Sequence, residues 1–231
     1  MPTTNTDPAH RVFRADGTEA DLGAWRAAWR SLLRAANVIT VFSENSRGLV
    51  AQAYPEYEAK LNVTPHTLLE ELPATKPGQS KDGKPVIGIL GNIGYPKGAD
   101  IVRGLSEKLA QQGGARLVVI GNVDPAYLPP KSTIVHGDYR VSDIPALIAR
   151  YGISQWFIPS IWPETFSYTT HETLATGLPV WSFDLGAQGD RVAAAAFERG
   201  QGGTISLELA SADPNAILDV MLKDQGKRNV A

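Results

Sequence analysis

The sequence of 231 residues lacks cysteine altogether, which excludes disulfide frameworks, thiolate metal sites and thiol nucleophiles. Its four histidines, at positions 10, 66, 136 and 171, are too dispersed to indicate a metal cluster. No apolar run approaches the roughly 18 to 20 residues that span a bilayer, so we expect no transmembrane segment. The opening MPTTNTDPAH lacks the basic and apolar regions of a signal peptide, so we expect a cytoplasmic location.

The sequence also lacks an excess of charge of one sign. Lys and Arg number 22 against 24 Asp and Glu, which gives a formal net charge of -2. Proteins that bind nucleic acid or anionic membranes concentrate basic residues, so we expect no nucleic-acid partner. The balance leaves open a peripheral association with the inner membrane.

Composition divides the chain into four parts. Residues 1–20 form a polar tail, and residues 21–69 form a small α/β segment. Residues 70–85, EELPATKPGQSKDGKP, are rich in Pro, Gly and Lys and show no hydrophobic period, which predicts a linker. Residues 86–225 form the main domain.

In the main domain, short apolar runs alternate with helical patterns, which predicts β-α units and a parallel sheet. The expected strands are Val86–Leu90, Leu117–Ile120, Trp156–Pro159 and Pro179–Phe183, and the expected helices are 98–112, 142–150, 166–176, 189–198 and 214–223. The strands are apolar throughout, as expected where helices cover both faces of a sheet. The predicted fold class is therefore α/β, with a Rossmann-like doubly wound parallel sheet.

The segment before the linker is too small for a second Rossmann-like domain and is expected to be an α/β remnant of one. Asp21 is a candidate cap for a helix, and Ser43 for a short helix that ends before Pro55. Extended runs are expected at Val38–Phe42 and Lys60–Thr64. The first helix has an apolar stripe that we expect another surface to cover, formed by Leu22, Trp25, Trp29, Leu32, Leu33 and Ala36.

The first motif with chemical content is the glycine-rich segment GILGNIGYPKGAD, from Gly88 to Asp100. A turn of this kind between a strand and a helix brings backbone N–H groups and the positive helix end close to an anion, and Lys97 adds a full charge. These features predict a phosphate site. The spacing fits neither a Walker A loop nor the dinucleotide G-x-G-x-x-G. The alternative is an ordinary tight turn with Lys97 in solvent.

The second motif spans Ser160 to Asp184 and contains two glutamates, Glu164 and Glu172. Eight residues advance about 12 Å along a helix, so the two carboxylates would contact separate parts of a ligand. Carboxylates accept hydrogen bonds from hydroxyls, which suits a ligand with two hydroxyl-bearing rings. The amides of residues 166–168 at the predicted helix start would hold phosphate between the rings. The alternatives are a helix-dipole charge for Glu164 and a solvated helix face for Glu172.

Taken together, these motifs resemble the retaining nucleotide-sugar glycosyltransferases of the GT-B fold, group 1 or family 4. The resemblance covers roughly residues 35 to 225. It rests on Pro163-Glu164-Thr165-Phe166, the gap to Glu172, Leu174-Ala175-x-Gly177-Leu178-Pro179-Val180, the Lys97-Gly98 pair and Val118-Val119-Ile120-Gly121.

The resemblance implies a role for each matching position. Lys97 would bind the diphosphate and Glu164 the donor sugar, as the catalytic positions. The implied donor-binding positions are Gly91, Asn92, Gly121, Asn122, His136, Thr165, Phe166, Ser167, Tyr168 and Glu172, of which Glu172 would contact the ribose and Gly121, Asn122 and His136 the base. No metal and no cofactor is implied. The family commonly has Arg where this sequence has Asn92, and often Gly where it has Ser167.

The implied activity is transfer of a sugar from a nucleotide-diphosphate sugar to a growing glycan, in polysaccharide or cell-surface glycan synthesis. The acceptor, a glycan or a lipid-linked sugar, would bind to an N-terminal domain that we expect to be missing here, which would leave this chain incomplete for transfer. The alternatives are an enzyme similar to sugar-nucleotide epimerases and a non-catalytic nucleotide-sugar-binding module.

Two further features have plain structural interpretations. The tryptophans of the main domain, Trp156, Trp162 and Trp181, are expected to serve in packing instead of offering platforms for sugars, since two of them lie in or beside core strands. The turn from Gly186 to Asp190 is expected to lead into a helix, with Asp190 as a candidate cap.

Overall fold

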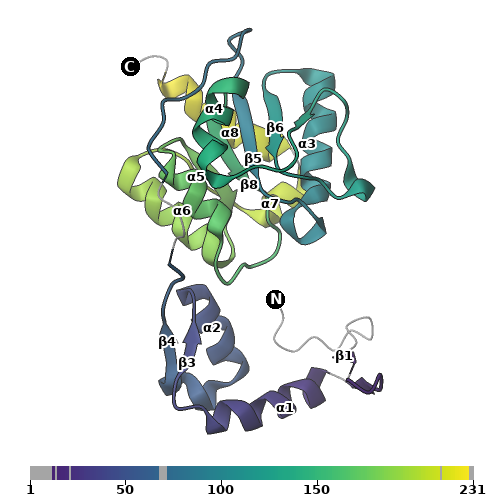
Figure 1. The fold of residues 1–231 in the computed structure, drawn as a ribbon, viewed down its shortest axis with the longest axis vertical. Coiled ribbons are helices and arrows are strands. Elements are labelled where there is room, and N and C mark those ends of the chain that lie inside the picture. Colours follow the sequence, from purple (N-terminus) through teal and green to yellow (C-terminus); the bar gives the residue numbers. More distant parts are fainter. Residues whose placement is uncertain (1–11, 14, 21, 68–71, 214, 229–231) are drawn as a thin grey trace. The chain divides into compact units, whose positions relative to one another are not determined.

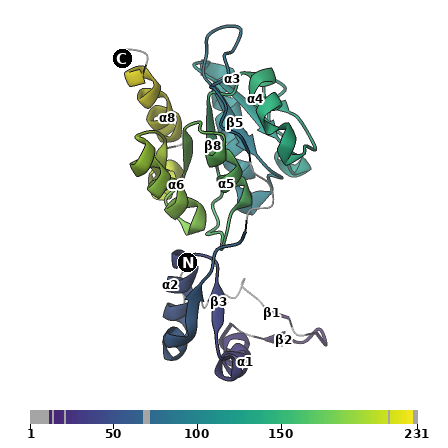
Figure 2. The same ribbon diagram turned by 60° about the vertical axis from the view of Figure 1, so that its left-hand side comes forward.

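The computed structural model describes residues 12–13, 15–20, 22–67, 72–213 and 215–228. The chain divides into two compact units, Met1–His66 and Thr67–Ala231, shown in two views in Figures 1 and 2. We call them unit 1 and unit 2 and describe each by itself. The candidate cap Asp21 lies outside the described residues, as does most of the predicted polar tail.

Unit 2 contains a parallel sheet of six strands in the order β7-β6-β5-β8-β9-β10. The strands are β5 (Val86–Leu90), β6 (Arg116–Ile120), β7 (Ile134–Val135), β8 (Gln155–Ile158), β9 (Val180–Phe183) and β10 (Gly203–Ile205). The order is that of the Rossmann fold, in which the first strand lies in the middle and the chain then builds outward on both sides. The four strands expected from apolar runs are confirmed. The short β7 and β10 were not predicted.

Helices cover both faces of this sheet, as the apolar strands predicted. The helices are α3 (Ala99–Gln112), α4 (Ile144–Tyr151), α5 (Tyr168–Ala175), α6 (Gly186–Arg199), α7 (Leu207–Ala212) and α8 (Asn215–Arg228), with single 3-10 turns η2 (Tyr95–Lys97), η3 (Pro125–Tyr127) and η4 (Val141–Asp143). One core cluster joins the sheet to α3, α7 and α8, and the other joins it to α4, α5 and α6. The doubly wound prediction is confirmed.

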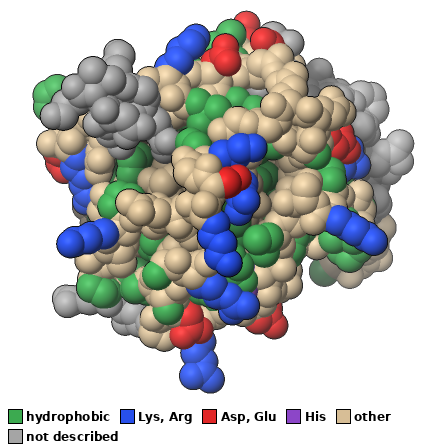
Figure 3. Space-filling model, turned by 90° about the horizontal axis from the view of Figure 1, so that it is seen from above, with side chains coloured by type: hydrophobic (Ala, Val, Ile, Leu, Met, Phe, Trp, Pro, Cys, Tyr) green, Lys and Arg blue, Asp and Glu red, His purple; other side chains and the backbone are tan. Residues whose placement is uncertain are grey.

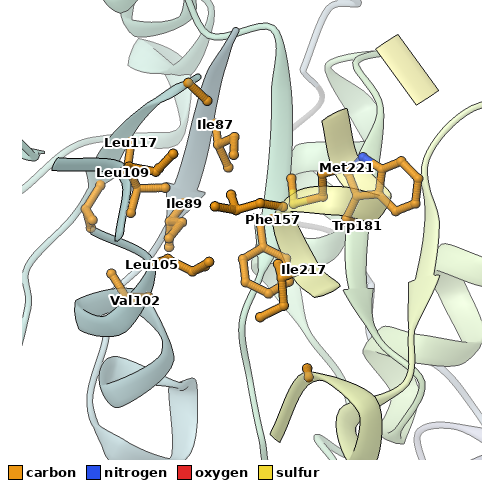
Figure 4. Packing of buried hydrophobic residues seen from close by; sticks show 14 of the residues in the cluster. Ile87, Ile89, Val102, Leu105, Leu109, Leu117, Phe157, Trp181, Ile217 and Met221 are labelled. Atoms are coloured by element: carbon orange, nitrogen blue, oxygen red, sulfur yellow. The ribbon is translucent and has the colours of Figure 1, made fainter. Parts of the chain in front are cut away.

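Alternation along the strands supplies both clusters. Ile87 and Ile89 of β5 point to the cluster with α3 and α8, whereas Val86 and Leu90 point to the opposite one. Figure 4 shows Ile87 and Ile89 with Phe157 and the helix residues that pack against the same face.

The strand order reverses between β5 and β8, because β5 pairs with β6 on one side and with β8 on the other. In sheets of this kind the loops at the carboxyl ends of the two strands separate there, and ligands bind in the resulting crevice. Figure 3 shows the surface seen from above Figure 1, where Lys and Arg side chains lie among Asp, Glu, hydrophobic and uncharged ones.

The described part of the predicted linker, residues 72–85, packs on unit 2. The amide of Thr75 donates to Thr176 O at 2.8 Å, and that of Gly78 donates to Ile153 O at 2.8 Å. Leu72 packs against the second core cluster. Most of the segment is exposed, as its polar composition predicted, and some of its backbone groups also find partners on the domain that follows.

Unit 1 pairs two short parallel strands, β3 (Ile39–Val41) and β4 (Leu61–Val63), at the positions where extended runs were expected. Its helices are α1 (Leu22–Ala35), α2 (Glu44–Ala53) and the 3-10 helix η1 (Pro55–Lys60), and β1 (Val12–Phe13) pairs with β2 (Glu19–Ala20). Ser43 caps α2 as predicted, since its side chain accepts from Ser46 N. Lys60 Nζ donates to Leu33 O, Arg34 O and Ala36 O at 2.8–3.2 Å, which satisfies carbonyls at the end of α1.

Candidate functional site

Two glycines bring together the loops that follow β5 and β6. Gly91 and Gly121 have φ values of 113° and 128°, a region that favours glycine. A Cβ on Gly121 would lie 2.1 Å from Gly91 O, so a side chain there would force the two loops apart. The contact is extended by Ile93 N, which donates to Asn122 O at 2.8 Å. The first loop is therefore fixed against its neighbour before Lys97 is reached.

Lys97 ends the 3-10 turn η2, and Gly98 turns the chain into α3 with a φ of 79°. A Cβ on Gly98 would lie 2.0 Å from Pro159 O, in the loop after β8. This close approach, which only glycine allows, places Lys97 beside the second motif.

The buried Ser160 connects the loop after β5 to the loop after β8. Its side chain is buried, and Oγ lies 3.2 Å from Pro96 O and 3.1 Å from Trp162 O, either of which can accept its proton. Ile161 N also donates to Pro96 O at 3.1 Å. The loop that carries Glu164 is thus bonded to the loop that carries Lys97.

The two predicted catalytic side chains meet. Lys97 Nζ lies 2.8 Å from Glu164 Oε2, with 43% of the lysine side chain and 10% of the glutamate side chain exposed. The other carboxylate oxygen, Oε1, is buried and has no hydrogen-bond partner among the described residues. A buried acceptor of this kind is costly unless a ligand or water satisfies it.

Lys97 and Glu164 line a small pocket at the carboxyl ends of β5 and β8, where the strand order predicts a ligand site. Its other lining residues are Leu90, Gly91, Asn92, Ile93, Ile158, Pro159, Ser160 and Thr169. Among the described residues that line it, Lys97 is the one cation. Asn92 stands where the family that the motifs resemble commonly has Arg.

Helix α5 begins at Tyr168, two residues later than the sequence indicated. Ser167 is its N-cap, with an extended backbone and a side chain that accepts from Thr170 N, so Phe166 and Ser167 precede the helix. The first-turn amides, which have no intrahelical acceptor, therefore belong to Tyr168 and Thr169 and not to Phe166. Sequence analysis did not single out Thr169, which lines the pocket.

The residues expected beside the base form a hydrogen-bonded group. Asn122 Nδ2 donates to Asp138 Oδ1 at 2.6 Å and to Asn92 Oδ1 at 3.3 Å. Asn92 and Asn122 line a shallow hollow next to the pocket, together with Gly94, Asp124 and their neighbours. The structure thus joins three loops at this point.

His136 lies in the same region but its side chain is held elsewhere. Nδ1 is 2.9 Å from the hydroxyl of Tyr151 on α4, and the two rings make an edge contact at 5.7 Å. This contact explains the position of the His136 side chain by its packing against α4.

Glu172 lies one turn into α5 and influences Tyr139, in the loop after His136. Burial and, to a smaller extent, the negative charge of Glu172 raise the pKa of the Tyr139 hydroxyl to about 12. Sequence analysis missed Tyr139, since a single tyrosine in a loop carries no signal. Tyr139 is close enough to Glu172 to be affected by its charge, so the residue predicted to contact the ribose lies near the loop predicted to lie beside the base.

Aromatic residues surround the start of α5. Phe166 stacks on His171 at 4.6 Å and meets Tyr168 edge-on at 5.0 Å. Burial, and then the charge of Arg191, lower the pKa of His171. Thr165, expected to contact the donor, is exposed beside them.

The tryptophan prediction holds for two of the three residues. Trp156 and Trp181 are buried, whereas Trp162 is 53% exposed. Trp162 lies past the end of β8, in the loop that carries Glu164, and for this residue the packing role stays a prediction.

No protein-family profile matches the chain. Two curated relatives are each named GDP-mannose-dependent alpha-mannosyltransferase. The protein from Mycobacterium tuberculosis is 33% identical over 117 residues, and that from Mycolicibacterium smegmatis is 31% identical over 117 residues. In both cases the match covers 49% of this chain and 29% of the relative, so the chain spans less than a third of the curated relatives it matches.

Similar solved structures include TarM, with a TM-score of 0.61 and 12% identity over 89% of this chain and 41% of TarM. Anabaena HepE in complex with UDP has a TM-score of 0.55 and 18% identity over 92% of this chain and 62% of HepE. The fold is that of the GT-B glycosyltransferases. The resemblance stated from the motifs is confirmed at this level, and the epimerase-like alternative is not favoured.

The described helices include none that is long and apolar enough to cross a membrane. In the same part of the chain, His, Asp and Glu side chains form no group of three that could hold a metal ion.

Proposed function

We propose that unit 2 is the donor-binding part of a retaining glycosyltransferase, which takes a sugar from a nucleotide-diphosphate sugar and passes it to a growing glycan. The observation that carries this proposal is the Lys97–Glu164 pair in the pocket between β5 and β8, where one buried carboxylate oxygen finds no partner in the part of the chain that the structure describes. The names of the two mannosyltransferase relatives make GDP-mannose the first donor to test.

In this proposal Lys97 acts on the leaving group. When the bond between the sugar C1 and the phosphate oxygen breaks, negative charge grows on the diphosphate, and a fixed cation stabilises it. The amides of Tyr168 and Thr169 lie in the first turn of α5, at the positive end of the helix, and would stabilise the same negative charge on the diphosphate. Asn92 supplies no charge, so Lys97 bears a larger share of this stabilisation than in relatives that have Arg.

Glu164 would hold the donor sugar. In the structure Lys97 pairs with its Oε2, while Oε1 has no hydrogen-bond partner among the described residues. A diphosphate draws the ammonium of Lys97 towards itself, and the carboxylate then accepts hydrogen bonds from sugar hydroxyls with both oxygens. The acceptor hydroxyl forms the new bond to C1 in place of the bond from C1 to the phosphate oxygen, which breaks, and its proton passes to the released diphosphate. Retention by attack from the same face and retention through an enzyme-linked intermediate are both compatible with this arrangement.

The nucleoside would lie along α5 and the adjoining loops. Glu172 is proposed to accept from the ribose hydroxyls, with Tyr139 beside it. Asn92, Asn122 and Asp138 are proposed to border the base, as is Gly121. His136 is left out of this proposal, because its side chain is held by Tyr151 on α4. A guanine presents two adjacent N–H donors, which suit the carboxylate of Asp138.

The acceptor would bind to a part that contacts unit 1. Helix α1 has no buried residue, and the side chains of Trp25, Trp29 and Leu32 are 42–57% exposed on one stripe. An apolar face of this kind indicates a covering surface. We propose that an acceptor-binding domain covers it, in keeping with the 29% of each mannosyltransferase that this chain matches. Peripheral association with the inner membrane would then be a property of that domain.

The test is calorimetric titration of the chain with GDP, GDP-mannose, UDP and UDP-glucose, alone and in the variants Lys97→Met and Glu172→Gln. A hydrogen bond to a charged group contributes about 1.5 to 3 kcal/mol, so each variant should weaken nucleotide binding at least roughly tenfold. Lys131→Met is the matched control, because Lys131 is exposed and lies outside the pocket lining. Absence of binding by the folded chain, or binding that Lys97→Met leaves unchanged, would contradict the proposal. Binding without transfer once an acceptor domain is supplied would favour the non-catalytic module.

A further inference from the structure

We propose that Gln188 is a positioning residue that sets the place of Glu164 in the pocket and thereby the affinity for the sugar part of the donor. The inference rests on the proposed function for what the pocket binds, but the contacts that carry it are properties of the unliganded chain. No motif singled out this glutamine, which lies in the first turn of α6.

The Gln188 side chain is completely buried and bonds to both sides of Pro163. Its Oε1 accepts from the amide of Glu164 at 3.1 Å, and its Nε2 donates to Trp162 O at 2.8 Å. A third bond runs from Ala187 N to Glu164 O at 2.9 Å. The peptide groups before and after Pro163 are therefore tied to the first turn of α6.

The loop that carries Glu164 lies close against the start of α6, at Gly186. Gly186 has a φ of 65°, and a Cβ there would lie 2.5 Å from Gln188 Oε1 and 2.6 Å from Glu164 N. Glycine thus lets the helix approach the loop closely enough for the glutamine to reach both peptide groups. Helix α6 in turn packs through Val192 and Ala195 in the second core cluster, so the loop is fixed to a rigid element.

This arrangement explains how a carboxylate on a loop can be held in one place. Ser160 ties the loop to the Lys97 loop on one side, and Gln188 ties it to α6 on the other. A binding group is effective when its own position is fixed by surrounding hydrogen bonds, because the ligand then does not have to order it. Loss of Gln188 should therefore affect the sugar that Glu164 contacts and spare the nucleotide that other residues contact.

The experiment compares the full chain with Gln188→Met, which keeps the side-chain volume and removes both hydrogen bonds. Hydrogen exchange measured by NMR on the unliganded proteins should show faster exchange of the Glu164 amide in the variant, by at least about tenfold. Calorimetry with GDP and GDP-mannose should show GDP-mannose bound roughly tenfold more weakly and GDP bound as before. In a Glu164→Gln background, Gln188→Met should add little, since both changes remove the same sugar contact.

Gln201→Met is the matched control. The Nε2 of Gln201 also donates to a backbone carbonyl, that of Gly177 at 2.9 Å, on residues outside the pocket lining. This variant should leave Glu164 exchange and both affinities unchanged. If folding of Gln188→Met fails, Gly186→Ala gives a second displacement of the same loop.

Three outcomes are distinguishable. Unchanged exchange of the Glu164 amide in Gln188→Met overturns the inference. Equal weakening of GDP and GDP-mannose overturns it as well, because the residue then supports the domain in general. If the unsubstituted chain binds neither ligand nor UDP and UDP-glucose, the proposed function fails and the role in sugar affinity fails with it, while faster Glu164 exchange in the variant would still support the hydrogen-bonded arrangement.

Discussion

Removing Lys97 and removing the charge of Glu164 should affect stability very differently, although the two side chains form one ion pair. Lys97 is 43% exposed, so water can solvate its ammonium when the glutamate is neutralised. Glu164 is only 10% exposed, and one of its buried oxygens already lacks a partner among the residues that the structure describes. Its charge loses its main compensation when the lysine is removed.

The magnitude follows from this asymmetry. Exposed ion pairs contribute about 0 to 1 kcal/mol, and breaking a buried one costs about 3 to 5 kcal/mol. With one partner half-exposed and the other nearly buried, Lys97→Met should lower the free energy of unfolding by about 1 to 3 kcal/mol. Glu164→Gln should change it by less than about 1 kcal/mol, because the amide removes a buried charge. The double variant should resemble Glu164→Gln alone.

The assay is urea unfolding followed by near-ultraviolet circular dichroism, to which the buried Trp156 and Trp181 of unit 2 contribute. The four proteins form a double-mutant cycle, and an unchanged dependence on urea would show that unfolding exposes the same surface in each. The reasoning would be refuted if Glu164→Gln were as destabilising as Lys97→Met, or if the two losses simply added.

Three further predictions concern single positions. Gly98→Ala should destabilise the chain by roughly 1 to 3 kcal/mol, because the residue has a positive φ and the new Cβ would collide with Pro159 O. Its control, Gly104→Ala, places a Cβ in open space within α3 and should stabilise the chain by about 0.5 to 1 kcal/mol. The urea midpoints of the two variants measure both changes. The raised pKa of Tyr139 means that the folded state keeps its proton above the ordinary value of 10, so the free energy of unfolding should fall as pH rises from 10 towards 12. The fall should be smaller in Tyr139→Phe, and the part that is left includes Tyr54, whose pKa burial also raises. For His171, whose pKa is lowered, the unfolded state binds the proton more readily, so stability should decrease as pH falls below 6.5, and NMR titration should show a pKa below that value.

The strands and helices of unit 2 were predictable where burial on both sheet faces leaves a long apolar run. Val86–Leu90 is such a run, and its bounds agree with β5. The short β7 and β10 escaped notice for the opposite reason: both residues of β7 are exposed, and β10 begins with Gly203. Edge strands of this length bury too little to leave a pattern. Their pairing is specified by the neighbouring strand, which a local window does not contain.

Helix starts were less predictable than helix existence. The sequence around Asp190 favoured a polar cap, but α6 begins at Gly186, where the cap position is Leu185 and no side chain makes a capping bond. The reason is tertiary, because the first turn of α6 is fixed by Gln188 and Ala187 bonding to the Glu164 loop. A cap rule based on local hydrogen bonds has no access to such contacts.

The candidate site shows the same division between local and non-local information. Lys97 and Glu164 were singled out by motif, and the strand order explains why residues 67 positions apart meet, since each follows one of the two strands at which the sheet reverses. Ser160, Thr169 and Gln188 carry no such signal, because a serine, a threonine and a glutamine are common everywhere. Their contribution depends on which carbonyl or amide lies opposite them. Residues that would contact the donor were therefore accessible from sequence, whereas the residues that hold them in place emerged only from the packing.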